Sequence, residues 1–190
     1  MAVTQPIRSK SQVQELANFY LKKGQYRNYV LIVLGVHTAL RISDLLCLRW
    51  SDVYDFEYRR FKKSVTLRER KTKKAKTFAL NKRIIQALTL LLDKAEPDAF
   101  LIENPRTKRS IGRVQAYRII RAASDALKFQ VRVSCHSLRK TFGYHAWKSG
   151  ASPAVIMEIY NHSSFAVTRR YLGVSQDDKD AVYLGLKLLA

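Results

Sequence analysis

The sequence predicts an α+β fold, with one mostly helical domain that carries a small antiparallel three-stranded sheet. Helical periodicity dominates the chain, and only residues 53–80 change to β-branched and aromatic residues separated by charges. With 190 residues and 47% hydrophobic content, the chain is long enough for one domain with a real core. Because it contains no internal repeat or interdomain linker, we expect residues 1–190 to form a single domain.

The first half of the chain predicts three helices and then the sheet. Ser11 and Gln14 form a capping-box pattern for a helix that stops at Gly24. The stretch "YRNYVLIVLGVHTAL" is apolar nearly all round, as expected of a helix in the centre of a domain. Ser43 is the predicted N-cap of a short helix within "RISDLLCLRW", and "SVTLRER" alternates like a strand.

The second half predicts five helices. Four of them span Asn81 to about Asp93, Gly112 to about Leu127, His136 to Ser149, and Pro153 to Tyr160. The last, "DDKDAVYLGLKLL", is amphipathic and has acidic residues in its first turn, where the helix dipole favours them. The amphipathic pattern fits packing of this helix on its own domain.

The charge balance predicts a polyanionic partner. The chain has 35 Lys and Arg against 15 Asp and Glu, and its formal charge of +20 repels itself in a compact state unless a polyanion relieves it. No apolar run approaches the roughly 18 residues of a membrane-spanning helix, and "MAVTQPIRSK" lacks a signal-peptide core. We therefore expect a soluble, intracellular (cytoplasmic) protein whose partner is nucleic acid and not a membrane.

The basic residues are concentrated in two segments. Residues 57–83 contain twelve basic and two acidic residues, and residues 106–121 contain six basic and no acidic ones. This concentration favours a contiguous phosphate-binding face over a merely solvated surface. The predicted DNA contacts are Lys73, Lys74, Lys76, Arg113, Arg118 and Arg121, with the Gly112 to Leu127 helix as the candidate major-groove reader.

One histidine and one arginine share a helix face near a predicted helix start. His136 and Arg139 are three residues apart, so both can face one ligand, and the helix N-terminus favours an anion and a neutral histidine. Gly143 continues this face and leaves room for close approach of another segment. His145 lies beside the apolar stripe and is predicted to be a hydrogen-bonded core histidine. By themselves, His136 and Arg139 fit an active site and an ordinary basic surface equally well.

Two further residue types need an interpretation. Cys47 and Cys135 form no C-x-x-C pattern and are predicted to be reduced, mostly buried thiols. In "NHSSFAVTRRYLG", His162 precedes Tyr171 by nine residues, and Tyr171 is either a nucleophile or a packing residue. Attack by a tyrosine at neutral pH needs a nearby base and cations that stabilise the phenolate.

Five motifs in order resemble the catalytic domain of the tyrosine recombinases, the phage integrase family. They are "TALRISDLLCLRWSDV", "RKTKKAKTFALN", "HSLRKTFGYHA", "NHSS" and "RRYLG", and the resemblance runs from about residue 9 to the end. It implies the DNA breaking-rejoining fold and a site made of Arg41, Lys71, His136, Arg139, His162 and Tyr171. Asp44 takes the acidic position after the first arginine and is expected to orient Arg41.

The resemblance also implies a reaction. Tyr171 would form a covalent 3′-phosphotyrosine link to DNA, with His136 as its base and Lys71 as the acid that protonates the departing 5′ oxygen. Arg41, Arg139 and His162 would stabilise the charge on the phosphate. A second 5′-hydroxyl would then rejoin the strand, so no metal, ATP or other cofactor is expected. The family further implies a homo-tetramer on double-stranded DNA and accessory DNA-bending proteins. For the C-terminal helix, residues 177–190, it adds exchange between protomers as an alternative to packing on its own domain.

The sequence departs from the family pattern at several positions. Tyr160 and Asn161 replace the usual Leu-Gly before the second histidine, and several lysines compete with Lys71 at the hairpin tip. We expect no separate N-terminal core-binding domain within residues 1–190, which leaves two interpretations: a compact member like the recombinases that invert fimbrial promoter segments, or a fragment of a longer integrase. Rival functions are a noncatalytic DNA-binding or regulatory protein and a type IB topoisomerase. A zinc or Cys-His hydrolase is disfavoured because Cys135 has no orienting third group.

Overall fold

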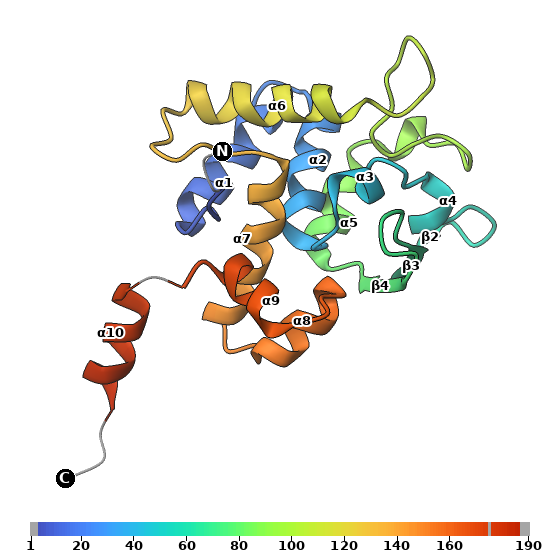
Figure 1. Ribbon diagram of the computed structural model, residues 1–190. Coiled ribbons are helices and arrows are strands. Elements are labelled where there is room, and N and C mark those ends of the chain that lie inside the picture. Colours follow the sequence, from blue (N-terminus) through green and yellow to red (C-terminus); the bar gives the residue numbers. More distant parts are fainter. Residues whose placement is uncertain (1–3, 175, 187–190) are drawn as a thin grey trace.

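The structure, a computed structural model, describes residues 4–174 and 176–186 and confirms the α+β class (Figure 1). Its first half contains α1 (Lys10–Leu21), α2 (Tyr26–His37), α3 (Ile42–Leu45), α4 (Trp50–Val53), β1 (Tyr54–Asp55), β2 (Arg60–Phe61), β3 (Ser64–Arg68) and β4 (Ala75–Ala79). The second half contains α5 (Lys82–Thr89), the 3₁₀ turn η1 (Leu92–Lys94), α6 (Arg113–Ala126), α7 (Cys135–Lys148), α8 (Pro153–Tyr160), α9 (Phe165–Leu172) and α10 (Gln176–Gly185). No helix in these ranges is long and apolar enough to cross a membrane.

Helix α2 lies at the centre of the fold, as its all-round apolar sequence predicts. It is buried from Val30 to Val36 and packs against α1, α5 and α7. Gly35 allows α7 to approach closely, because a Cβ at this position would lie 2.6 Å from Cδ1 of Leu138. Through this contact the central helix supports α7, which carries His136 and Arg139.

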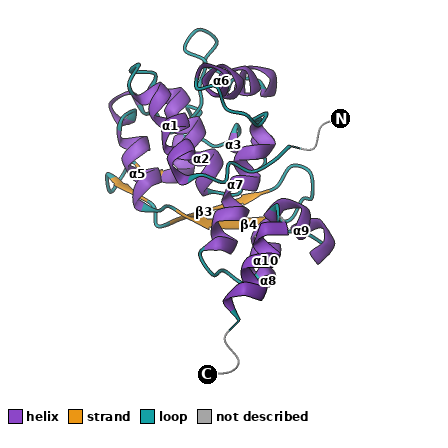
Figure 2. Ribbon diagram, turned by 90° about the vertical axis from the view of Figure 1, so that its left-hand side faces the viewer, coloured by secondary structure: helices purple, strands orange, loops and turns teal. Residues whose placement is uncertain are grey.

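The strands do not form the single three-stranded sheet that the sequence predicts. The described residues form two separate antiparallel hairpins, β1 with β2 and β3 with β4, and a bend at Lys63 separates them. In the longer hairpin Ser64 pairs with Ala79 and Arg68 with Ala75, so the tip spans residues 69–74. Figure 2 shows this hairpin extending from the α5 side of the fold towards α7 and α9.

Two predicted helix starts are also wrong. The N-cap of α1 is Ser9, whose Oγ accepts a hydrogen bond from the backbone N of Gln12 at 3.3 Å, while Ser11 lies inside the helix and contacts the Ser9 hydroxyl. Helix α3 starts after Arg41 and not after Ser43. By contrast, α6 and α8 follow their predicted ranges, and Ser152 caps α8 ahead of Pro153.

Helices α7, α8 and α9 form the second part of the core around Tyr160, Ile156 and Leu172. His145 is hydrogen-bonded to the carbonyl of Ile7 at 3.0 Å, which confirms its predicted core role. Both cysteines are free, and the prediction of mostly buried thiols is wrong for the exposed Cys47.

Helix α10 stands away from the other helices in Figure 1. At its first turn Asp178 is paired with Lys148 of α7, with 2.5 Å between Oδ1 and Nζ. Further along, its apolar side chains Val182, Tyr183 and Leu184 are exposed. The predicted helix continued to Leu189, and residues 187–190 lie outside the described part of the chain.

Candidate functional site

Four segments that are far apart in the sequence surround one groove of about 1240 Å³. They are the loop after α2, the tip of the β3–β4 hairpin, the segment that leads into α6, and the N-terminal end of α7, with Tyr171 of α9 on the wall. Of the six predicted catalytic residues, the groove is lined by Arg41, Lys71, His136, Arg139 and Tyr171. The sixth, His162, contacts the Tyr171 ring instead.

The ring of Tyr171 lies between two histidines. Its centroid is 4.9 Å from that of His136 and 4.6 Å from that of His162, and both pairs meet edge to face. The guanidinium carbon of Arg139 is 5.8 Å from the centroid of the same ring. The structure therefore brings together a tyrosine, two candidate proton acceptors and a cation, as the sequence predicts.

Both histidines are held in the neutral form. Loss of hydration, and then the positive charges of Lys140, Arg139 and Arg41, lower the pKa of His136 to about 4. Burial and the charges of Arg139 and Arg41 likewise lower the pKa of His162 to about 4. His136 is the second residue of α7, so the helix dipole acts in the same direction. A neutral imidazole can accept a proton from Tyr171 at neutral pH.

Arg139 and Tyr160 hold each other through reciprocal hydrogen bonds. Nη2 of Arg139 donates to the Tyr160 carbonyl at 3.0 Å, and the Tyr160 hydroxyl donates to the Arg139 carbonyl at 2.6 Å. Both side chains are almost fully buried, and Nη1 of Arg139 donates to the Ala39 carbonyl. Gly143 makes this arrangement possible, since a Cβ there would lie 2.9 Å from Cε2 of Tyr160 and closer still to its hydroxyl. The predicted close approach at Gly143 is confirmed.

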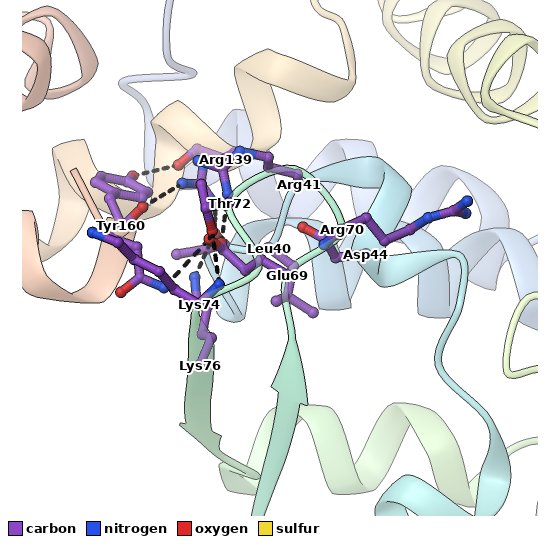
Figure 3. A network of polar contacts seen from close by, with 12 residues as sticks. Leu40, Arg41, Asp44, Glu69, Arg70, Thr72, Lys74, Lys76, Arg139 and Tyr160 are labelled. Carbon is purple, nitrogen blue, oxygen red and sulfur yellow. Dashed lines mark hydrogen bonds and ion pairs between the residues drawn. The ribbon is translucent and has the colours of Figure 1, made fainter. Parts of the chain in front are cut away.

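Asp44 does not pair with Arg41, contrary to the sequence expectation. Nη1 of Arg41 lies 2.6 Å from Oε1 of Glu69, a fully buried carboxylate of the hairpin tip. Asp44 is also buried, but its Oδ1 accepts from the backbone N of Arg70 at 3.0 Å. Asp44 therefore fixes the hairpin tip, and Glu69 orients the arginine, as the close view in Figure 3 shows.

Glu69 stays ionised despite its burial. Burial alone would raise the pKa of this carboxyl group, but hydrogen bonds from Thr72 and Arg41 and the Arg41 charge outweigh that effect and lower the pKa. Oε2 accepts a hydrogen bond from Oγ1 of Thr72 at 2.6 Å and from Nδ2 of Asn161 at 3.3 Å. One carboxylate thus connects the Arg41 loop, the hairpin tip and the end of α8.

The lysines of the hairpin separate into two groups. Lys71 is exposed and lines the groove, and Lys73 and Lys74 are exposed at the tip. Lys76, predicted to contact DNA, is 5% exposed, and its Nζ donates to the Ala39 carbonyl at 2.8 Å. Burial, followed by the charge of Arg139, lowers the pKa of Lys76 to about 7. Because its ammonium faces the protein, Lys76 is not placed to contact DNA directly.

The three predicted DNA contacts on α6 are not equivalent. Arg113 lines the groove at the start of the helix, and Arg118 is exposed. Arg121 is half-buried and lies 2.5 Å from Asp125, one turn further along. The charge of Arg121 is therefore partly balanced within the helix.

Sequence reasoning missed Glu69, the inward direction of Lys76, and the contacts of Tyr160 and Asn161. The inward direction of Lys76 follows from the alternation of side chains along β4. Lys76 and Phe78 are buried, and the residues between and beside them are exposed. The contact between Glu69 and Asn161 joins residues 92 positions apart, and no local pattern predicts it.

Comparison with known proteins gives one consistent family. The Phage integrase family profile matches residues 8–177. A probable integrase/recombinase, YoeC of Bacillus subtilis, is 36% identical over 183 residues, which cover 96% of this chain and 97% of that protein. A tyrosine recombinase of Thermosipho africanus is 24% identical over 92% of this chain but only 59% of its own length.

Solved structures agree on the fold. The crystal structure of XerA recombinase has a TM-score of 0.79 at 22% identity and covers 95% of this chain and 65% of that one. XerH site-specific recombinase, bound to its palindromic difH substrate, has a TM-score of 0.74 at 15% identity over 96% of this chain and 53% of its own. The chain thus spans nearly all of YoeC but about half to two thirds of these longer recombinases.

Proposed function

The chain belongs to the phage integrase family, and we propose on this basis that it is a site-specific DNA recombinase that cuts and rejoins strands through Tyr171. The observation that carries the assignment of the nucleophile is the position of the Tyr171 ring. It lies between two neutral histidines on the wall of a basic groove. A noncatalytic DNA-binding protein has no need of this arrangement.

The first half of the proposed reaction is strand cleavage. Oη of Tyr171 attacks the scissile phosphorus and forms a P–O bond, while the bond from phosphorus to the 5′ oxygen breaks. The tyrosine proton passes to His136, whose ring lies 4.9 Å away centroid to centroid. Lys71, which also lines the groove, gives a proton to the departing 5′ oxygen. The products are a 3′-phosphotyrosine and a free 5′-hydroxyl.

The charge around the groove suits the pentacoordinate transition state. Arg41 and Arg139 both line it and place positive charge where negative charge develops on the nonbridging oxygens. The His162 ring contacts the tyrosine ring, and its Nδ1 lies 3.1 Å from the hydroxyl of Thr168. This contact leaves Nε2 of His162 as the nitrogen for the phosphate.

The second half of the reaction is strand exchange. A 5′-hydroxyl from a partner strand attacks the phosphotyrosine, and the tyrosine leaves as the acid and base roles reverse. Because the phosphotyrosine keeps the energy of the original phosphodiester, the cycle needs neither ATP nor a metal. The partner is double-stranded DNA, whose phosphates would also bind Arg113 at the groove and the exposed Lys73, Lys74 and Arg118.

Strand exchange between two sites requires several protomers, and we propose a tetramer in which α10 contacts a neighbouring copy. Asp178 in the first turn of the helix is paired with Lys148 of α7, but beyond that turn the helix exposes Val182, Tyr183 and Leu184 (Figure 1). Deletion of residues 177–190 is expected to abolish synapsis and exchange while cleavage by single protomers persists. Unchanged exchange by the shortened chain would contradict this role of α10. Accessory DNA-bending proteins would assist assembly of the same complex.

A nicked suicide substrate tests the catalytic assignment. Such a substrate loses the cleaved end by diffusion, so the covalent protein–DNA adduct accumulates and is seen as a slow band on a denaturing gel. We expect an adduct for the wild-type protein with and without EDTA, and none for Tyr171→Phe. An adduct that persists in Tyr171→Phe would refute the nucleophile. Relaxation of supercoiled plasmid without exchange would indicate a topoisomerase, and absence of both would favour a DNA-binding protein.

A further inference from the structure

The segment that departs most from the family pattern, Tyr160 and Asn161 ahead of His162, makes the contacts that join the two halves of the site. Helix α8 ends at Tyr160 and is capped by Asn161, which adopts left-handed backbone angles of φ 55° and ψ 35°. Asparagine and glycine are the residues that best tolerate this conformation. The backbone N–H of the next residue, His162, donates to the Met157 carbonyl at 3.1 Å, so the turn fixes where the histidine starts.

The side chain of Asn161 crosses from this turn to the hairpin. Its Nδ2 donates to Oε2 of Glu69 and to the carbonyl of Ala75, both at 3.3 Å. A glycine at this position could close the same turn but could make neither contact. The carboxamide therefore supplies two contacts that a glycine would lack, both to the hairpin that carries Lys71.

Glu69 passes the contact on to the hairpin tip. Its buried carboxylate also accepts from Oγ1 of Thr72 at 2.6 Å, and Thr72 directly follows Lys71. The other carboxylate oxygen of Glu69, Oε1, lies 2.6 Å from Nη1 of Arg41 (Figure 3). The chain of contacts runs from the His162 turn through Asn161, Glu69 and Thr72 to the neighbouring Lys71, which lines the groove.

We propose that Asn161 and Glu69 form a latch that positions Lys71 for transfer of a proton to the leaving 5′ oxygen. Asn161 is a positioning residue in this proposal, because it does not line the groove and acts through the hairpin tip. The inference rests on the proposed function, since it takes Lys71 as the acid. Without the latch, the exposed tip samples more conformations and the ammonium group meets the leaving oxygen less often.

The variant that isolates the latch is Asn161→Gly. Glycine keeps the left-handed turn without strain, so the change removes the carboxamide and little else. In single-turnover cleavage of an ordinary phosphodiester we expect the rate to fall about tenfold, as for loss of one transition-state hydrogen bond. With a substrate that has sulfur in place of the bridging 5′ oxygen, we expect a rate within about twofold of wild type, because a thiolate leaves without a proton.

Two control variants separate this mechanism from a loss of fold. Thr72→Val leaves α8 untouched but removes the contact between Glu69 and the tip, and it should show the same sulfur-rescued defect. In a Lys71→Ala background, Asn161→Gly should slow cleavage no further, because both changes remove the same proton transfer. The DNA affinity and melting temperature of Asn161→Gly should stay close to those of the wild type.

Three results would overturn the proposal. The first is wild-type cleavage of the ordinary substrate by Asn161→Gly, and the second is an equal slowing on both substrates. The third is a full additional loss in the Lys71→Ala background. Failure of the sulfur substrate to rescue Lys71→Ala itself would instead overturn the assignment of Lys71 as the acid, so the two failures are distinguishable.

Discussion

Substitution of Gly143 by alanine tests how tightly α7 and α8 support the site. The new Cβ would lie 2.9 Å from Cε2 of Tyr160 and closer still to its hydroxyl, and this ring is fully buried. Overpacking of this kind destabilises a core by about 1–3 kcal/mol. Displacement of the hydroxyl also leaves the Arg139 carbonyl without its donor, which costs about 1–3 kcal/mol.

Alanine has a higher helix propensity than glycine, which offsets about 1 kcal/mol of this loss. We therefore expect Gly143→Ala to lower the free energy of unfolding by about 3 kcal/mol in urea titrations. Cleavage should also slow, because Tyr160 lies 5.0 Å from His162 and 5.1 Å from Tyr171, centroid to centroid. A displaced ring disturbs both of these residues.

The controls for Gly143→Ala follow from the same contacts. Gly185→Ala adds a Cβ with no heavy atom within 4 Å and should change stability by less than about 0.5 kcal/mol. In a Tyr160→Phe background, Gly143→Ala should be less destabilising by about 1–2 kcal/mol, because the hydroxyl contact is already gone. Wild-type stability of Gly143→Ala, or the same loss in both backgrounds, would refute the reasoning.

Three further predictions concern charge. Glu69→Gln should lower the free energy of unfolding by roughly 2–4 kcal/mol and slow cleavage, because it breaks the ion pair with Arg41. Asp44→Asn keeps the oxygen that accepts from the backbone N of Arg70 and should change the free energy of unfolding by about 1 kcal/mol or less. Urea titrations and cleavage rates of the two variants test this difference. Lys76 has its pKa lowered from 10.5 to about 7, so between these values the unfolded chain binds the proton that the folded chain does not. The free energy of unfolding should therefore rise with pH by up to about 1.4 kcal/mol per unit in this window, and Lys76→Met should flatten the slope; an equal slope in the variant would contradict the assignment. Because the pKa values of His136 and His162 lie at about 4, kcat/KM for cleavage should stay flat from about pH 5.5 to 7, and an inflection near pH 6.5 would show that a histidine has its ordinary pKa.

The long helices could be predicted from the sequence because their signals are local. Helix α8 begins at a proline behind a serine cap and ends at Tyr160, as predicted, and α2 is buried as its apolar run requires. The N-cap of α1 cannot be chosen from the sequence in the same way, because Ser9 and Ser11 are both residues that favour this position. The choice between them depends on where the preceding chain enters the fold, which the sequence does not encode locally.

The site was predicted where it follows a motif and missed where it depends on long-range packing. Arg41, His136, Arg139 and Tyr171 converge on the groove as expected. The partner of Arg41 was wrongly predicted to be Asp44, three residues away, because the true partner, Glu69, comes from a hairpin whose docking the local sequence does not specify. The unusual Tyr160 and Asn161 likewise gained an interpretation only from contacts across the fold.

The measurement that tests the central claim most directly is identification of the residue joined to DNA. The protein is trapped on a nicked suicide substrate, digested with a protease and a nuclease, and examined by mass spectrometry. We expect one peptide that contains Tyr171 and carries a nucleotide through a 3′-phosphotyrosine link. A nucleotide attached to any other residue, or attachment through a 5′-phosphate, would contradict the account.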